Sequence, residues 1–125
     1  MPAGRGFGFG RGRGGGQRKM FFLESCLMVL LLREPGYGYS LMTGLESFGF
    51  QTGQMDMSII YRALRDLEAS GLVTSTWDDD SLGPQRRVYA ITQQGKTTLA
   101  GWMESLKLRR KEIEKLEAVY DAVSK

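Results

Sequence analysis

Hydrophobic and polar residues follow one another along the chain in a pattern that predicts two helices in its first half. A mostly apolar run over residues 26–32 predicts a helix over roughly 19–33, because charged residues bracket a run too short to span a bilayer. Pro35 ends this helix, since proline disfavours helical backbone at the residue before it. A short second helix is predicted after the turn at 36–40. Its inward-facing residues are Leu41, Met42, Leu45 and Phe48.

A third helix is predicted from an N-cap at Asp56 or Ser58 to a C-terminal stop at Gly71. Placed at 100° per residue, this helix has two faces. The apolar face contains Ile60, Ala63, Leu64 and Leu67, and the opposite face contains Ser58, Tyr61, Arg62 and Arg65. Arginine bonds guanine bidentately and hydroxyls reach bases or phosphates, so the polar face suits reading of the DNA major groove. The alternative is a solvated face on which Asp66 or Glu68 pairs with the arginines.

A β-hairpin is predicted after the third helix. Residues 72–77 are rich in Thr, Val and Trp, and 86–91 form the returning strand after a turn that contains Gly and Pro. Thr92 then caps a final helix that runs nearly to the end. This order is that of a winged helix-turn-helix, in which the second helix of the pair enters the major groove. The predicted fold class is mainly α with a small β-hairpin and a long C-terminal helix.

Apolar residues recur every seven positions in the final helix, in two series offset by three. The eight positions are Leu99, Trp102, Leu106, Arg109, Ile113, Leu116, Tyr120 and Val123. A helix of about 30 residues is about 45 Å long, which is more than the preceding domain can cover. We therefore expect a homodimer whose interface contains all of these residues except Arg109. The alternative is that the first half packs within the protomer and the second half frays.

Charge is distributed unevenly along the sequence. There are 17 Lys and Arg residues against 14 Asp and Glu, for a net charge of +3. The first 19 residues hold five cations and no acid, which leaves 12 basic and 14 acidic side chains and a net charge of −2 in the remainder. The first 16 residues interleave Gly with Arg and Phe, a composition typical of disorder and of RGG-type segments that bind nucleic acid. The overall basic charge is therefore no argument for DNA binding by the folded part.

Residue types that most enzymes need are scarce, since histidine is absent and cysteine occurs once. Ser-His and Cys-His dyads and histidine metal sites are thereby excluded. Cys26 cannot form an internal disulfide, and within an apolar helix its thiol has a raised pKa and little reactivity. We therefore expect a protein that is not an enzyme, uses no metal or cofactor and resides in the reducing cytoplasm.

Three motifs carry a resemblance to a known family. They are SIIYRALRDLEASGLV at 58–73, RVYAIT at 87–92 followed by Gly95, and GYGYSL at 36–41. Over about residues 20–123 the chain resembles the PadR family of bacterial transcriptional regulators, in particular its shorter subgroup with one C-terminal helix. The resemblance implies a homodimeric winged-helix regulator, usually a repressor, that binds a palindromic operator in double-stranded DNA and often releases it when a small molecule binds.

These patterns lead to a set of candidate site residues. Candidate DNA-binding residues are Ser58, Tyr61, Arg62 and Arg65 on the third helix, with Arg86, Arg18 and Lys19 on phosphate. In multidrug-responsive members of the resembled family, an aromatic residue of the last helix lines a flat pocket at the dimer interface. The resemblance therefore implies a small aromatic or drug-like effector at Trp102, with Met103 and Leu99.

The expected organisation has three parts: a disordered Gly/Arg-rich tail over 1–18, a winged-helix DNA-binding domain over 19–92 and a dimerisation helix over 93–125. Two other functions remain open on these residues. One is an RNA-binding module driven by the tail, and the other is a winged helix that serves only as a protein-interaction adaptor. A comparison of binding to duplex DNA and to RNA after tail deletion distinguishes the first, and absence of any specific DNA site distinguishes the second.

Overall fold

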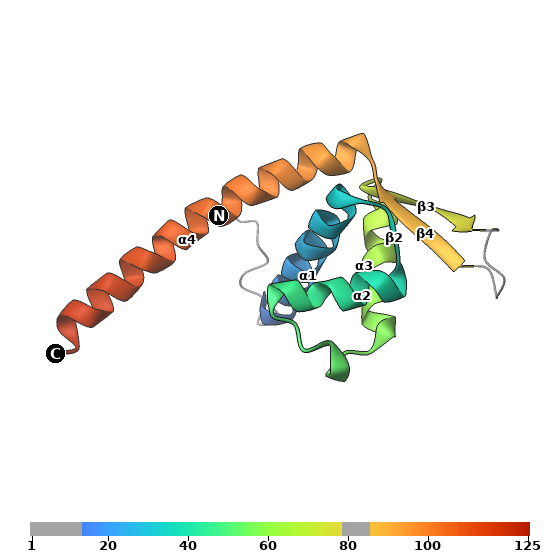
Figure 1. The fold of residues 1–125 in the computed structure, drawn as a ribbon. Helices are drawn as coiled ribbons and strands as arrows, with labels where there is room; N and C mark the ends of the chain where they lie inside the picture. The colour runs from blue at the N-terminus through green and yellow to red at the C-terminus, as the bar shows by residue number, and fades with distance from the viewer. Residues whose placement is uncertain (1–13, 79–85) are drawn as a thin grey trace.

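The computed structural model describes residues 14–78 and 86–125, and helices dominate these residues (Figure 1). The regular elements are α1 (Gly14–Arg33), β2 (Gly36–Tyr37), α2 (Gly38–Gly44), α3 (Met57–Ala69), β3 (Val73–Asp78), β4 (Arg86–Ile91) and α4 (Gln93–Val123). Two 3₁₀ turns, Leu45–Phe48 and Thr52–Gln54, connect α2 to α3. The predicted order of helices and hairpin is confirmed.

The strands form one antiparallel sheet in the order β2-β4-β3. The hairpin of β3 and β4, hereafter the wing, pairs Val73 with Ile91 at its base and Asp78 with Arg86 at its outer end. The sequence did not predict β2, which has two residues and no alternation of its own and forms only by pairing with β4. The turn at 79–85 lies outside the described residues.

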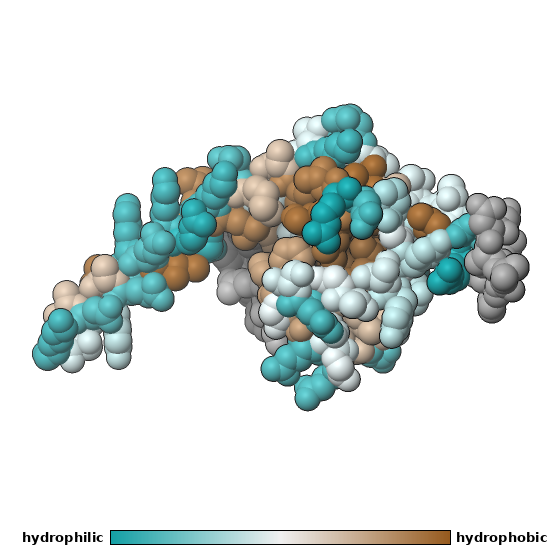
Figure 2. Space-filling view, viewed as in Figure 1, coloured by the Kyte–Doolittle hydropathy of each residue, from teal (hydrophilic) through white to brown (hydrophobic). Residues whose placement is uncertain are grey.

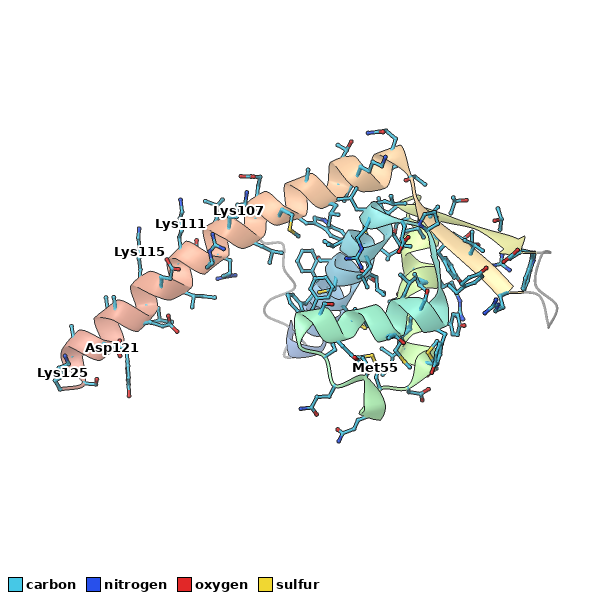
Figure 3. All side chains as sticks on the ribbon, viewed as in Figure 1. Met55, Lys107, Lys111, Lys115, Asp121 and Lys125 are labelled. Carbon is cyan, nitrogen blue, oxygen red and sulfur yellow. The ribbon has the colours of Figure 1, made fainter. Side chains whose placement is uncertain are left out.

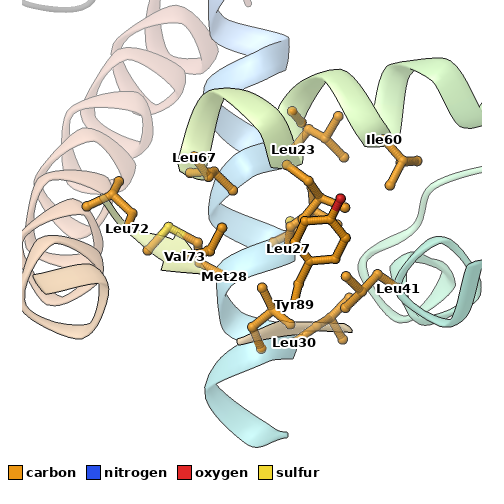
Figure 4. Close-up of a cluster of buried hydrophobic side chains, with 14 of the residues drawn as sticks. Leu23, Leu27, Met28, Leu30, Leu41, Ile60, Leu67, Leu72, Val73 and Tyr89 are labelled. Carbon is orange, nitrogen blue, oxygen red and sulfur yellow. The ribbon is translucent and has the colours of Figure 1, made fainter. Parts of the chain in front are cut away.

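The hydrophobic core is built around α1 (Figure 4). Leu27 and Met28 on α1 have no exposed surface, and α3 contributes Ile60 and Leu64, which are also fully buried. Tyr89 of β4 closes the core from the sheet side. Burial of side chains of this kind contributes about 1.5–3 kcal/mol each. The predicted apolar face of α3 is therefore confirmed as a core face.

The first helix begins earlier than the sequence predicts. α1 starts at Gly14, whereas the predicted start is about residue 19, so residues 14–18 of the expected tail belong to a helix. A helix that is held by packing along its length extends at its end by adding one backbone hydrogen bond per residue, without a new nucleation step. Arg18 and Lys19 therefore lie on the first turns of α1, and the remainder of the tail, 1–13, lies outside the described residues.

Local capping signals set the ends of α3. The Asp56 carboxylate accepts a hydrogen bond from the Ser58 N–H at 3.0 Å, so of the two predicted caps Asp56 is the one used. At the other end Gly71 adopts a φ of +80°, which favours glycine. The N–H of Gly71 bonds the Glu68 carbonyl, and the N–H of Leu72 bonds the Leu67 carbonyl. This is the reversal of chain direction that glycine commonly provides after a helix.

α4 leaves the rest of the molecule halfway along its length (Figure 1). Leu99 is buried and Trp102, Met103 and Leu106 are partly buried, whereas every residue over 107–123 is exposed. We call 93–106 the inner half of α4 and 107–123 the outer half. Among the described helices, none is long and apolar enough to cross a membrane.

Candidate nucleic-acid interface

The outward face of α3 is formed by the side chains that its amphipathic pattern predicted. Ser58, Tyr61, Arg62 and Arg65 are all exposed, and Ile60, Ala63, Leu64 and Leu67 on the opposite side are buried. The apolar face anchors the helix in the core, so the polar face is held on a rigid support. Two guanidinium groups one turn apart on such a support can each donate two parallel hydrogen bonds to a guanine edge.

Tyr61 has a packing role in addition to its exposure. A Cβ atom at Gly38 would lie 2.6 Å from Cε1 of Tyr61, so only glycine at that position lets the ring rest on the first turn of α2. Tyr61 as a residue is 41% exposed. Tyr61 therefore joins α2 to α3 and presents its outer edge between them.

The exposed side of α2 adds residues that the sequence pattern did not indicate as DNA contacts. Tyr39 is 69% exposed, and Ser40 and Thr43 are exposed beside it. The first helix of a helix-turn-helix crosses the DNA backbone, where a phenol or hydroxyl can bond phosphate. One sequence feature could have indicated that Tyr39 is exposed, namely that it does not share a helical face with Leu41 and Leu45, which are buried. The glycines at 36–40 favour a turn at this point, so the sequence did not place Tyr39 on a helix.

The outer end of the wing is tied to the start of α2 through Tyr37. The Tyr37 hydroxyl donates a hydrogen bond to the Asp78 carboxylate, and the Arg86 guanidinium lies over the Tyr37 ring at 4.3 Å from its centroid. Arg86, a predicted phosphate contact, is exposed. It is thus stacked on an aromatic face while its donors remain open to solvent.

Arg87 lies in a second network, one residue further along β4. Its Nε donates to Ser75 Oγ at 3.0 Å, Ser75 Oγ donates to a Glu68 carboxylate oxygen at 2.9 Å, and the guanidinium lies over Trp77 at 4.7 Å. These contacts join the wing to the last turn of α3. They indicate a structural role for Arg87 and leave Arg86 as the candidate phosphate contact on β4.

Burial shifts the pKa of three groups near the core. It raises the pKa of the Tyr89 phenol, so this group is neutral beneath α3. It raises the pKa of the Cys26 thiol to about 11, which leaves the thiol protonated and unsuited to nucleophilic chemistry. The pKa of the Glu24 carboxyl is raised by burial and by the neighbouring Asp66 charge.

The residues predicted for the dimer and effector surfaces separate into two groups. Leu99 is 3% exposed and packs in the core of its own protomer, so its assignment to a shared surface is corrected. The Trp102 ring contacts the Phe21 ring with centroids 4.9 Å apart, and Met103 is partly buried beside the core. The exposed apolar residues of the outer half on the predicted face, hereafter the outer seam, are Ile113, Leu116, Tyr120 and Val123.

Comparison with known proteins relates this arrangement to a family. Residues 27–101 match the sequence profile described as the transcriptional regulator PadR-like family. A protein from Lysinibacillus sphaericus described as uncharacterized is 27% identical over 78 residues, which cover 62% of this chain and 72% of that protein.

Solved structures give the same relationship. A conserved protein described as a potential transcriptional factor is 36% identical, with a TM-score of 0.71 over 98% of this chain and 97% of the other. A PadR-like transcriptional regulator from Bacillus cereus is 30% identical, with a TM-score of 0.67 over 80% and 95% of the two chains. A PadR-like transcription factor from Bacteroides fragilis, at 24% identity and a TM-score of 0.71 over 82% and 96%, is similar in fold.

Proposed function

The chain belongs to the PadR-like family of transcriptional regulators, which bind DNA and are not enzymes, and from this premise we propose that it is a homodimeric, ligand-responsive repressor acting on a palindromic operator. Each protomer places α3 in the major groove of one half-site. Ser58, Tyr61, Arg62 and Arg65 contact the DNA there. Arg86 of the wing and Arg18 and Lys19 of α1 contact phosphates.

The observation that carries this proposal is the division of α3 into a fully buried apolar face and an exposed face with two arginines. Burial of the apolar face gives the two arginines a rigid support. Sequence reading requires one, because bidentate hydrogen bonds to a base edge tolerate little displacement.

The outer seam supports the homodimer. Its four residues range from 46% exposed at Ile113 to 74% exposed at Val123, at the heptad spacing of paired helices. Figure 2 shows brown apolar patches along this part of α4 between teal polar side chains. A second copy of the same helix covers the seam and gives the two-fold symmetry that a palindrome requires.

The contact between α1 and α4 supports a site for an effector. Trp102 and Phe21 form a partly exposed aromatic pair, and Met103, the next residue of α4, is partly buried and has an adaptable thioether side chain. A planar aromatic molecule that stacks on Trp102 from the dimer side changes the separation of the two protomers, and with it the spacing of the two α3 helices.

A comparison of arginine variants tests the proposal. An operator is first selected from random DNA duplexes, and binding is then measured by fluorescence anisotropy at several salt concentrations. Arg62→Ala and Arg65→Ala should each weaken binding by about 1–3 kcal/mol if they read guanine edges. Lys111→Ala is the matched control, because Lys111 is exposed on α4 and points away from the domain (Figure 3).

The control should change binding by less than about twofold. Equal effects of all three substitutions mean that the arginines act only through net charge, which contradicts the proposed reading of bases. Failure of the selection to enrich any duplex site contradicts the proposal as a whole. Stronger binding to RNA than to duplex DNA of the same sequence favours an RNA-binding module instead.

A further inference from the structure

The start of α4 is bonded to the end of α3 through one threonine. The Thr92 hydroxyl lies 2.8 Å from the Gly71 carbonyl oxygen and 3.1 Å from the Leu72 carbonyl oxygen, and it accepts a hydrogen bond from the Gly95 N–H at 2.9 Å. Because a hydroxyl has one proton, it shares that proton between the two carbonyls while its lone pair caps α4. The Thr92 N–H also donates to the Leu72 carbonyl at 3.0 Å.

We call the contact of Thr92 and Gly95 with Gly71 and Leu72 the joint, and backbone geometry holds both of its sides in place. On the α3 side, the positive φ of Gly71 and the two backbone bonds that end the helix direct the carbonyls toward Thr92. On the α4 side, a Cβ atom at Gly95 would lie 2.1 Å from the Leu72 carbonyl oxygen, so the first turn of α4 rests directly on the chain that leaves α3. The end of α3 and the start of α4, which carries the outer seam, are therefore in direct contact.

The remaining contacts of α4 with the domain are of a different kind. Leu99 and Trp102 hold the inner half against α1 by apolar packing. Apolar contact is non-directional, so it limits the distance between two helices more than their angle. Hydrogen bonds depend on direction, and those of Thr92 constrain the angle.

We propose that Thr92 is a positioning residue for operator binding, because its hydroxyl fixes the angle between α3 and α4 and thereby the separation of the two α3 helices in the dimer. This inference rests on the proposed dimeric function. The 31 residues of α4 span about 46 Å, so a rotation of about 5° at the joint displaces the far end of the helix by about 4 Å. One base-pair step of DNA is about 3.4 Å, so such a rotation changes the half-site spacing that the dimer fits.

Comparison of threonine, aspartate and serine at position 92 separates the capping of α4 from the hydrogen bonds to the end of α3. Thr92→Asp keeps an oxygen that caps α4, and aspartate is a strong N-cap, but the ionised carboxylate has no proton to donate to Gly71 and Leu72. Thr92→Ser keeps both roles and is the matched control. Gly95→Ala disturbs the same joint independently, by forcing the first turn of α4 away from the Leu72 carbonyl.

The experiment measures affinity for a series of duplexes in which the two half-sites are moved apart one base pair at a time. The native protein and Thr92→Ser should prefer one spacing, with a loss of about tenfold for each base pair of change. Thr92→Asp should bind three or more neighbouring spacings within about threefold of one another, and Gly95→Ala should broaden or shift the optimum. Circular dichroism checks that each variant is folded, and affinity for a single half-site should not change.

The outcomes separate this inference from the proposed function. If the native protein shows no preferred spacing, the proposed dimer on a palindrome fails. If the native protein prefers one spacing and the folded variants at 92 and 95 keep the same optimum with the same loss of affinity for each base pair of change, the role of the joint is overturned. A uniform loss of affinity at every spacing also overturns it, because that is the effect of lower stability alone.

Discussion

The two halves of α4 have the same heptad spacing but different surroundings. The inner half places Leu99 in the core of the protomer and Trp102 against Phe21. The outer half carries apolar residues at the same spacing, interrupted by Arg109, yet every one of its residues is exposed, and its ion pair between Arg109 and Glu112 is exposed as well. Heptad spacing therefore shows that a helix face needs a partner, without showing whether that partner is the same chain or a second copy.

The comparison also assigns different consequences to substitutions in the two halves. Changes in the inner half should lower the stability of the protomer, because they remove core contacts. Changes in the outer seam should alter association and leave the folding of the protomer intact. Each of the following experiments tests one side of this division.

The largest effect is expected from charges placed in the outer seam. Ile113→Glu combined with Leu116→Glu should raise the dissociation constant of the dimer at least about 1000-fold, because unpaired carboxylates become buried between the helices. Sedimentation equilibrium measures this constant. The control is Leu108→Glu with Ala122→Glu, two exposed positions of the same half that lie off the seam and should leave association nearly unchanged. Equal weakening by both pairs contradicts the assignment of the seam.

A core substitution in the inner half should have the next largest effect. Leu99→Ala should lower the free energy of unfolding by about 2–5 kcal/mol, because it removes buried methyl groups and leaves a cavity. Leu108→Ala is the matched control, since Leu108 is 63% exposed and should change stability by less than about 0.5 kcal/mol. Urea denaturation measures both values. Similar losses for the two variants show that the halves are not distinct.

The boundary between the halves is tested at the ring pair. Trp102→Leu and Phe21→Leu keep apolar volume but remove the aromatic contact, so a double-mutant cycle should give a coupling of about 0.5–1.5 kcal/mol in protomer stability. Titration of the native protein with planar aromatic molecules, followed by tryptophan fluorescence, tests the effector site in the same region. A coupling near zero would mean that the contact of Trp102 with Phe21 does not stabilise the protomer. Trp102 would then resemble the exposed residues of the outer half.

The smallest effect is expected from Glu24 on α1, the helix that supports the inner half. Because burial and Asp66 raise the pKa of this carboxyl, the folded state favours its protonated form. Its ionisation therefore lowers stability as the pH rises from below the ordinary value through the raised one. Glu24→Gln should be more stable than the native protein at pH 7 by less than about 1 kcal/mol, and equally stable at pH 3.5. Urea unfolding of both proteins at the two pH values measures this difference. A difference that does not change with pH contradicts a raised pKa at Glu24.

Features with local signals were predictable from the sequence. The cap at Asp56, the stop at Gly71 and the cap at Thr92 depend on residues a few positions apart, and the structure contains all three. The two faces of α3 were predictable for the same reason, because helical periodicity relates residues three and four positions apart.

Features that depend on distant residues were not predictable. Tyr37 binds Asp78 across 41 positions, and no short-range pattern marks either residue for the other. The same holds for β2, whose partner is β4. The spacing of Leu99 matches that of Ile113 and so predicts a shared surface, and only the packing of the whole chain shows that Leu99 is a core residue.

Amide hydrogen exchange of α4 at increasing protein concentration tests the central distinction most directly. We expect the inner half to be protected equally at all concentrations, because its protection comes from the fold of the protomer. The outer half should exchange rapidly in dilute solution and become protected as the dimer forms. Rapid exchange of the outer half at every concentration, or equal responses of both halves, would contradict the assignment of the inner half to the protomer and the outer half to the dimer.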